Sequence, residues 1–342
     1  MHCNDFPEMN STHIIGTGSF VPKRILTNEM LQEIVDTNDA WIVRRTGIRQ
    51  RRIASPELGE STVQMAAKAA SSALMMANVP ASVIDTIIVA TITPDRQFPS
   101  TACLVQNELA AVNAAAWDIS AGCSGFLYAL QMAVNAIRCK TSETALVIGS
   151  ERLSSITNWK DRGTCVLLGD GAGAVVLQAS SNGDGILSTH LGSDGSAWDL
   201  LYSDDGNSYV PPSLKPLDLK PFHLKMTGSR LFKHAVGCMS AIARKALDHN
   251  DMTVKNIDMV IPHQANERII SATAEHLGLP MNKFYLNLDQ YGNTSSASIP
   301  IALDQAYRSS QLKPEDNVLL ISFGAGLTWG AAILRWMLSK YE

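Results

Sequence analysis

Several patterns that assign a protein to a class are missing from this sequence of 342 residues. Its six cysteines include no Cys-X-X-Cys pair, and no metal-ligand spacing is present. A chain of this length does not need a disulfide framework, so reduced thiols are expected. No apolar run approaches the ~18 residues that cross a bilayer, and the N-terminus "MHCNDFPEMNST" has no basic region followed by an apolar stretch. These absences predict a cytoplasmic protein with no metal and no membrane span.

Charge of either sign is also not in large excess. The chain has 28 Lys and Arg residues against 32 Asp and Glu residues, a net charge of -4, so no strong field favours nucleic acid or an anionic membrane. Two glycine-rich stretches lack the order of a nucleotide-binding loop. "GTGSF" (16–20) has no third glycine, and "GDGAGAVVL" (169–177) has no P-loop lysine. We interpret the latter as structural.

An internal repeat is present at a constant offset of 173 residues. "VIDTIIVAT" (83–91) corresponds to "NIDMVIPHQ" (256–264), and "ALVIGSE" (145–151) corresponds to "VLLISFG" (318–324). "FLYALQMA" (126–133) corresponds to "IPIALDQA" (299–306). Identity within the pairs is weak, but three pairs at one offset indicate a tandem duplication, which is a signature to seek before any other.

The repeat and the hydrophobic pattern together predict an α/β fold with two similar sheets. Short continuous apolar runs such as "TALVIGS" and "NVLLISF" are typical of strands that are covered on both faces. Helices are predicted over 62–77, 126–138, 228–248, 266–277 and 297–309. We predict a disordered tail over 1–12, an N-terminal half over 13–185 and a C-terminal half over 186–342. The second half includes a long connecting segment, 193–222, rich in Ser, Asp, Gly and Pro.

Cys123 lies at a loop-to-helix junction in "AGCSGF" and corresponds to Ser296 under the repeat. A helix N-terminus offers unpaired N–H groups and a partial positive charge. A thiol there is expected to lose its proton more easily and to act as a nucleophile. The alternative is a core cysteine whose small neighbours allow close packing.

Three further segments add groups that suit acyl transfer. His263 directly follows an apolar strand in "VIPHQAN", and Asn293 precedes the second repeat's helix in "YGNTSSAS". "SFGAGLTWG" (322–330) is a turn of small residues whose N–H groups can face a cavity. Each has a structural alternative: a satisfied core histidine, a helix cap or a tight turn. Together, a thiol, a neutral imidazole, an amide and a backbone nest predict a thioester acyl-transfer site.

In combination, these segments resemble the β-ketoacyl-acyl-carrier-protein synthase III family, the initiating condensing enzymes of the thiolase-fold superfamily. The resemblance covers the chain from about residue 13. It implies a thiolase-like fold with tandem halves in a layered αβαβα arrangement. It also implies a catalytic triad of Cys123, His263 and Asn293, and an oxyanion hole formed by the N–H groups of Cys123 and Ala325. Its motifs are "DAWIVRRTGIRQRRI" (39–53), "AGCSGF", "DRGTCVLLGDGAGAVVL" (161–177), "PHQANERIISATAEHLG" (262–278), "YGNTSSAS" and "FGAGLTWGAA".

The motifs separate this family from its superfamily relatives. Elongating condensing enzymes have a second histidine in place of Asn293, and thiolases have a second cysteine in the C-terminal glycine turn. The middle of that turn, often glycine in the family, is Ala325 here. Alanine keeps the backbone N–H group, so an oxyanion hole with the Cys123 N–H group is still expected. It requires backbone angles in the turn that alanine can adopt.

The resemblance further implies how the substrates bind. No cofactor is expected to stay bound, since coenzyme A enters as the thioester substrate, and the partners are acyl-coenzyme A, malonyl-acyl-carrier protein and a second copy of the chain. Glu275 and His276 replace two positions that can be basic in relatives, so docking of the carrier protein is expected to differ. The implied residues are Thr37, Trp41, Arg45 and Arg162 for coenzyme A, Phe98 and Leu201 for the acyl pocket, and Gln264, Arg268 and Lys233 for the carrier protein. The resemblance also implies that Phe98 reaches across the dimer into the partner's pocket and limits the length of the acyl chain.

The expected reaction is the decarboxylative condensation of a short acyl-coenzyme A, expected to be acetyl-coenzyme A, with malonyl-acyl-carrier protein at the start of fatty-acid synthesis. Two alternatives stay open. One is a secondary-metabolism ketosynthase with the same triad and another acyl donor. The other is a non-catalytic partner subunit, which would be expected to lack the nucleophile.

Overall fold

Two β-sheets with the same strand order form the frame of the protein. The computed structural model describes residues 11–180, 184–203 and 223–338. The order of the first sheet is β1-β7-β6-β4-β5 and that of the second is β8-β13-β12-β11. The first consists of β1 (Ser11–Phe20), β7 (Asp170–Ser180), β6 (Thr144–Arg152), β4 (Thr86–Ala90) and β5 (Ala115–Ile119), and the second of β8 (Ile186–Ser193), β13 (Thr328–Arg335), β12 (Asn317–Gly324) and β11 (Met259–Pro262).

Strand directions also match between the sheets. In the first sheet, β1 with β7 and β7 with β6 pair antiparallel, whereas β6, β4 and β5 run parallel. In the second, β8 with β13 and β13 with β12 pair antiparallel, whereas β12 and β11 run parallel. The two halves therefore contain mixed sheets of the same topology, as a tandem duplication requires.

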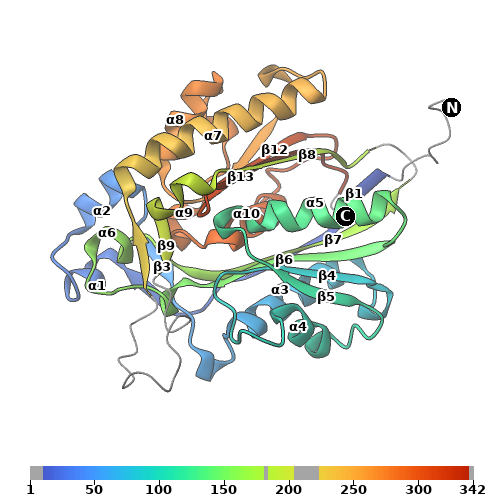
Figure 1. Ribbon diagram of the computed structural model, residues 1–342, viewed down its shortest axis with the longest axis horizontal. Coiled ribbons are helices and arrows are strands. Elements are labelled where there is room, and N and C mark those ends of the chain that lie inside the picture. The colour runs from blue at the N-terminus through green and yellow to red at the C-terminus, as the bar shows by residue number, and fades with distance from the viewer. Residues whose placement is uncertain (1–10, 181–183, 204–222, 339–342) are drawn as a thin grey trace.

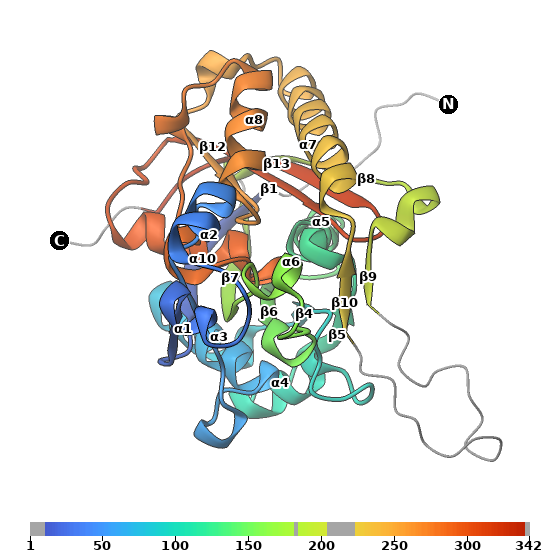
Figure 2. The same cartoon turned by 90° about the vertical axis from the view of Figure 1, so that its left-hand side faces the viewer.

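Helices cover both faces of each sheet and give five layers, visible from bottom to top in Figure 1. Figure 2 looks nearly along α5, which lies between the sheets. The layered thiolase-like architecture predicted from the sequence is confirmed. Each of the five predicted helices begins and ends within one residue of the observed helix. The outer helices are α3 (Thr62–Ala77) and α4 (Thr101–Leu109) on one side and α7 (Gly228–His249) and α8 (Glu267–Leu277) on the other, with α5 (Gly125–Arg138) and α10 (Ser298–Arg308) between the sheets.

The offset of 173 residues relates equivalent elements of the two halves. It superposes the start of β6 on that of β12 and the start of α5 on that of α10. It also relates two short 3-10 turns, η3 (Gly122–Ser124) before α5 and η8 (Ser295–Ala297) before α10. The apolar faces of α5 and α10 lie in one buried cluster that includes residues of both sheets. The central layer thus brings the N-termini of two equivalent helices into the same region of the molecule.

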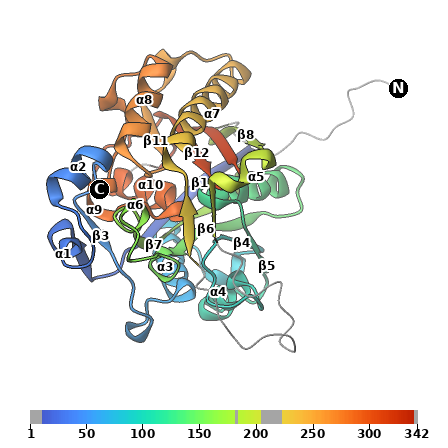
Figure 3. The same ribbon diagram turned by 60° about the vertical axis from the view of Figure 1, so that its left-hand side comes forward.

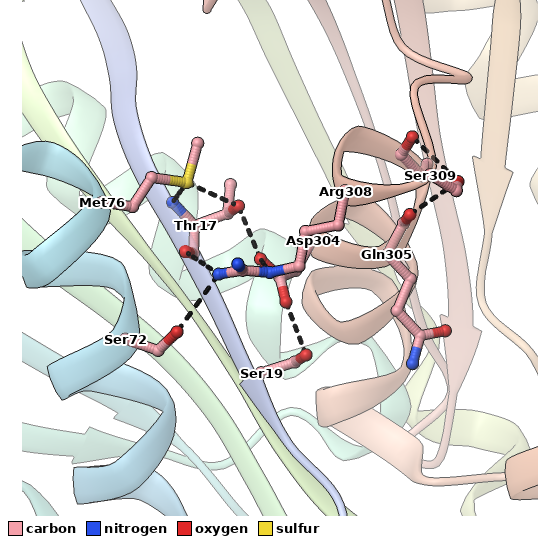
Figure 4. A network of polar contacts seen from close by, with 9 residues as sticks. Thr17, Ser19, Ser72, Met76, Asp304, Gln305, Arg308 and Ser309 are labelled. Atoms are coloured by element: carbon pink, nitrogen blue, oxygen red, sulfur yellow. Dashed lines mark hydrogen bonds and ion pairs between the residues drawn. The ribbon is translucent and has the colours of Figure 1, made fainter. Parts of the chain in front are cut away.

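A polar network ties α10 to the first sheet and its outer helix (Figure 4). Asp304 is 1% exposed and accepts hydrogen bonds from the hydroxyls of Thr17, at 2.8 Å, and Ser19, at 2.6 Å. Arg308 Nε lies 2.8 Å from Asp304 Oδ1, and its NH2 group reaches Ser72 on α3. Because both carboxylate oxygens have donors, this buried charge is satisfied within the central layers.

Short elements form a separate layer beside the sheets. Arg51 is fully buried there and donates to the carbonyls of Leu26 and Val166 and to Asn28 Oδ1. It fastens the segment around α2 to the loop that precedes β7. These elements are β2 (Ile25–Thr27), α1 (Asn28–Gln32), α2 (Asp39–Thr46), β3 (Gln50–Arg52), α6 (Arg162–Cys165), β9 (Leu201–Ser203), β10 (Leu224–Met226) and α9 (Leu288–Tyr291).

Some expected boundaries differ from the structure. β1 begins at Ser11, so the last two residues of the expected tail, 1–12, belong to a paired strand. The expected connecting segment 193–222 is regular at its start, with a 3-10 turn over Gly195–Leu200 and then β9. Its remaining residues, 204–222, lie outside the described part of the chain, as do residues 1–10. The "GDGAGAVVL" stretch lies mostly inside β7, in the body of the first sheet.

Candidate active site

One cavity of about 1500 Å3 contains all the predicted reactive groups. Cys123 comes from η3 of the first half, whereas His263 follows β11 and Asn293 precedes η8 in the second. Ala325 lies in the turn between β12 and β13. Figure 3 shows α2, α6 and α8, which also contribute lining residues, on one side of the molecule. The fold therefore assembles the site from both halves.

The backbone around Cys123 packs very closely against the Ala325 turn. A Cβ atom added to Gly324 would lie 2.5 Å from the Cys123 nitrogen, and one added to Gly122 would lie 2.8 Å from the Ala325 nitrogen. Gly122 also has a left-handed backbone, with φ of +53°. Ala325 is outside that region, so its conformation suits an alanine. The two N–H groups of the expected oxyanion hole thus belong to neighbouring backbone segments.

The Cys123 thiol is held in its protonated form. Burial raises its pKa to about 12, and the Glu151 carboxylate acts in the same direction, against a hydrogen bond from Ser295 that lowers it. The expectation that the helix N-terminus makes this thiol acidic is therefore wrong for the chain without substrate. Desolvation is the largest of these effects, and it acts although Cys123 lines the cavity and keeps part of its surface accessible.

His263 is buried, and burial lowers the pKa of its imidazole to about 3. The ring is therefore neutral at physiological pH, the form that can donate one hydrogen bond without charge. Its Nδ1 lies 2.7 Å from the Ser298 hydroxyl, which also accepts the Gln264 N–H at 3.4 Å. If the Ser298 hydroxyl donates to Nδ1, Nε2 carries the proton and becomes the donor.

Asn293 is fixed through both its backbone and its side chain. Its N–H donates to the Leu167 carbonyl at 2.8 Å, and its own carbonyl accepts from the Gly169 N–H at 2.9 Å. Oδ1 accepts the Ser295 N–H at 2.8 Å. Since the oxygen is occupied in this way, the Nδ2 amino group is the part of the amide left to act as a donor.

Glu151 and Ser295 are two buried residues of this region that were not predicted from the sequence. Glu151 near the end of β6 accepts hydrogen bonds from the hydroxyls of Ser295 and Ser296, at 3.1 and 2.8 Å. A glutamate at the end of a strand gave no signal by itself. The repeat does contain a signal, since it places Glu151 opposite Gly324 and Ser296 opposite Cys123.

The expected coenzyme A residues gather beside α2 and α6. The Trp41 ring has the Arg45 guanidinium 4.9 Å and the Arg162 guanidinium 4.8 Å from its centroid. Arg162 NH1 also donates to the Asp36 carbonyl at 2.7 Å. The Thr37 hydroxyl is buried and has no partner among the described residues. A flat aromatic ring with two cations close to it suits a purine ring, whereas Thr37 does not line the cavity and its buried hydroxyl is not placed to meet that ring.

A further residue near this group was not predicted. Asn266 lines the cavity, and its side chain caps α8 by accepting the Arg268 N–H at 2.9 Å. The same side chain donates to the Arg45 carbonyl at 3.2 Å. It thus connects the expected coenzyme A group with the start of the helix on which a carrier protein was expected to dock. A cap position in "HQANER" was its only signal.

The expected acyl-pocket residues lie apart in the single chain. Leu201 lines the cavity, as predicted for a pocket residue. Phe98 does not, and its side chain is 85% exposed. An aromatic residue that serves the partner's pocket would have this exposure in one chain.

One of the expected carrier-protein contacts must be corrected. Gln264 is 1% exposed, and its amide bonds to the carbonyls of Pro262 and Tyr285 and to the Asn287 N–H. A side chain enclosed in this way is unable to meet a docking protein. Arg268 and Lys233 are exposed and line the cavity.

Across residues 11–180, 184–203 and 223–338, no group of three or more His, Cys, Asp or Glu side chains could hold a metal ion. Among the described helices, none combines the length and apolar character needed to cross a membrane.

The duplicated fold and the Cys123 site define an acyltransferase of the thiolase-fold superfamily. Two family models match the chain: 3-oxoacyl-[acyl-carrier-protein (ACP)] synthase III over residues 117–195, and its C-terminal region over 247–336. The β-ketoacyl-[acyl-carrier-protein] synthase III of Caldanaerobacter subterraneus is 49% identical, covering 94% of this chain and 97% of the relative. The Clostridium acetobutylicum enzyme of the same name is 45% identical, covering 96% and 99%.

Solved structures agree with the sequence relatives. The crystal structure of 3-oxoacyl-[acyl-carrier-protein] synthase III from Aquifex aeolicus is 46% identical, with a TM-score of 0.89 over 95% of this chain and 100% of that one. The priming β-ketosynthase of the R1128 polyketide biosynthetic pathway is 34% identical, with a TM-score of 0.90 over 98% and 99%. The chain belongs to the β-ketoacyl-acyl-carrier-protein synthase III family.

Proposed function

We propose that the protein condenses a short acyl-coenzyme A, acetyl-coenzyme A in the first place, with malonyl-acyl-carrier protein to begin fatty-acid synthesis in the cytoplasm. The observation that carries the proposal is the convergence of Cys123, His263, Asn293 and the Ala325 turn on one cavity. The Trp41 group at the same cavity suits the coenzyme A moiety.

In the first half-reaction, the Cys123 sulfur attacks the thioester carbonyl of acyl-coenzyme A. A new carbon–sulfur bond forms, the bond to coenzyme A breaks, and the proton that leaves Cys123 ends on the coenzyme A sulfur. The N–H groups of Cys123 and Ala325 stabilise the negative oxygen of the intermediate. One such donor is typically worth about 3–4 kcal/mol of barrier. The product is an acyl thioester on Cys123.

In the second half-reaction, malonyl-carrier protein loses carbon dioxide. The electrons of the broken carbon–carbon bond form an enolate, whose oxygen accepts hydrogen bonds from His263 Nε2–H and Asn293 Nδ2–H. The enolate carbon then attacks the acyl group on Cys123, a carbon–carbon bond forms and the thiolate leaves. With a thiol pKa of about 12, the thiolate takes a proton from solvent readily and resets the site.

We also propose that the chain works as a homodimer. β5 is an edge strand of the first sheet, so its outer backbone groups are available to pair with a second chain. Phe98 supports the same interface by its exposure. Sedimentation of the protein at micromolar concentration should give twice the mass of one chain, whereas a monomer at all concentrations would contradict this part.

The experiment that tests the proposed function follows the two half-reactions separately. Acylation is measured by mass spectrometry of Cys123 after incubation with acetyl-coenzyme A, and decarboxylation by carbon dioxide release from malonyl-carrier protein. Cys123→Ala should lose acylation and condensation but keep some carbon dioxide release. His263→Ala and Asn293→Ala should keep acylation and decarboxylate poorly, and their double variant should be little worse than either one.

One outcome would require another mechanism. If His263→Ala released carbon dioxide at the wild-type rate but lost acylation, His263 would be the base that activates the thiol.

A second candidate function is supported by one comparison. The 34% identical priming ketosynthase belongs to a polyketide pathway, so the same fold also serves secondary metabolism. The chemistry at Cys123 would be unchanged and only the acyl donor would differ. A mixture of acyl-coenzyme A species, analysed for the mass added to Cys123, distinguishes the two functions by the preferred acyl group.

A further inference from the structure

Glu151 is a fully buried carboxyl group for which the proposed reaction has no use. It is surrounded by five hydrogen-bond donors, and none of these donors carries a charge. Three come from the turn after β4: the Thr91 hydroxyl at 3.3 Å, the Ile92 N–H at 3.1 Å and the Thr93 hydroxyl at 2.6 Å. The others are the hydroxyls of Ser295, at 3.1 Å, and Ser296, at 2.8 Å. The carboxyl group therefore fastens η8 of the second half to a turn of the first.

The internal repeat shows what Glu151 replaces. Gly324, its equivalent, packs against Cys123 and leads into the turn that holds Ala325. In the first half, Glu151 packs instead against Ser296, the equivalent of Cys123. The Ser296 hydroxyl is 1% exposed and lies within hydrogen-bond distance of both Glu151 and the Ala90 carbonyl. Ser296 therefore occupies the position that is equivalent to Cys123. The Glu151 carboxyl group lies against it in the place where the turn of Gly324 and Ala325 lies against Cys123.

Ser295 links this carboxyl group to the reactive residues. It has a left-handed backbone, with φ of +49°, which is unfavourable for a residue with a side chain. Its N–H donates to Asn293 Oδ1 at 2.8 Å, and its hydroxyl contacts both Glu151 and the Cys123 thiol. A strained backbone persists only where its surroundings hold it, and here the Ser295 side chain is held by its hydrogen bond to Glu151.

We infer that Glu151 is a positioning residue for decarboxylation: through Ser295 it keeps Asn293 Oδ1 engaged and so leaves the Asn293 amino group to face the enolate. The inference rests on the proposed function. If the Glu151 contact is lost, Ser295 relaxes toward an ordinary backbone conformation and its N–H leaves Asn293. The amide can then turn its oxygen toward the enolate, which replaces a hydrogen bond by repulsion.

Substitutions of Ser295 test the backbone part of the inference. Ser295→Ala removes the hydroxyl, and carbon dioxide release should fall about 10- to 100-fold, less than the roughly 100- to 1000-fold typical of deleting an oxyanion donor, because Asn293 is misaligned rather than removed. Cys123 acylation should fall clearly less than carbon dioxide release, although the loss of the Ser295 hydrogen bond also raises the pKa of the thiol. Ser295→Gly also lacks the hydroxyl but accepts the left-handed backbone freely, so it should release carbon dioxide about fivefold faster than Ser295→Ala. Ser240→Ala, which removes a buried hydroxyl on α7, is the matched control and should match wild type.

Substitutions of Glu151 test the anchor itself. Glu151→Gln keeps the shape, since its oxygen can accept from Thr93 while its amino group donates to the hydroxyls of Ser295 and Ser296, and it should retain decarboxylation within about threefold. Glu151→Ala should behave like Ser295→Ala.

Three results would overturn the inference: equal loss of both half-reactions in Ser295→Ala, wild-type carbon dioxide release in that variant, or a Ser295→Gly variant slower than Ser295→Ala. A wild-type protein that neither acylates Cys123 nor releases carbon dioxide would instead refute the proposed function.

Discussion

Lowering the pH should destabilise this protein through His263, and the size of the effect follows from its burial. Because burial lowers the folded-state pKa to about 3, the unfolded chain binds a proton near pH 6.5 while the folded chain does not. The stabilisation is therefore complete above pH 6.5 and is lost as the pH falls from there toward 3. Between pH 7 and pH 5 the free energy of unfolding should decrease by about 2 kcal/mol from this residue alone.

Urea denaturation at pH 7 and pH 5 measures this loss when wild type is compared with His263→Asn, which has no titrating ring. Between pH 7 and pH 5, the free energy of unfolding of His263→Asn should fall by about 2 kcal/mol less than that of wild type. His276→Asn, at an exposed histidine on α8, is the control and should keep the wild-type decrease. Carbon dioxide release should also show no histidine titration between pH 5 and pH 8, since the neutral ring is the donor. An identical pH dependence of stability in wild type and His263→Asn would refute the reasoning.

Three further predictions concern the substrates. Trp41→Ala should raise the KM for acyl-coenzyme A about five- to tenfold and spare carbon dioxide release, because two cation–π contacts of about 0.5–1 kcal/mol each organise the group; steady-state kinetics with both substrates would show an equal effect on each if Trp41 were only structural. Phe98→Thr should speed longer acyl donors several-fold relative to acetyl, since each buried methylene contributes about 0.8 kcal/mol; an unchanged donor profile would remove Phe98 from the pocket. Arg268→Glu should raise the KM for malonyl-carrier protein without slowing acylation of Cys123, and loss of acylation as well would point to coenzyme A binding or misfolding.

The positions of helices and reactive residues were accessible from the sequence because they depend on local pattern. The apolar spacing of α3 and α5 follows the helical period, and the predicted bounds agree with the structure to within a residue. The offset of 173 residues predicted the paired sheets and the two equivalent turns before α5 and α10. Cys123 and Asn293 stood out because each lies among small residues before a helix, and His263 because it directly follows a strand.

The chemical state of those residues was decided only by the tertiary structure. The free thiol of Cys123 is not acidic, because desolvation raises its pKa and the Glu151 carboxylate acts in the same direction. Gln264 follows the reactive histidine in sequence, yet its amide is enclosed by the segment around Asn287. Ser295 adopts a left-handed backbone, and its side chain is held by Glu151, 144 residues away in the chain. A pKa or a strained turn depends on which distant groups pack around a residue, and a pattern of neighbours along the chain does not contain that information.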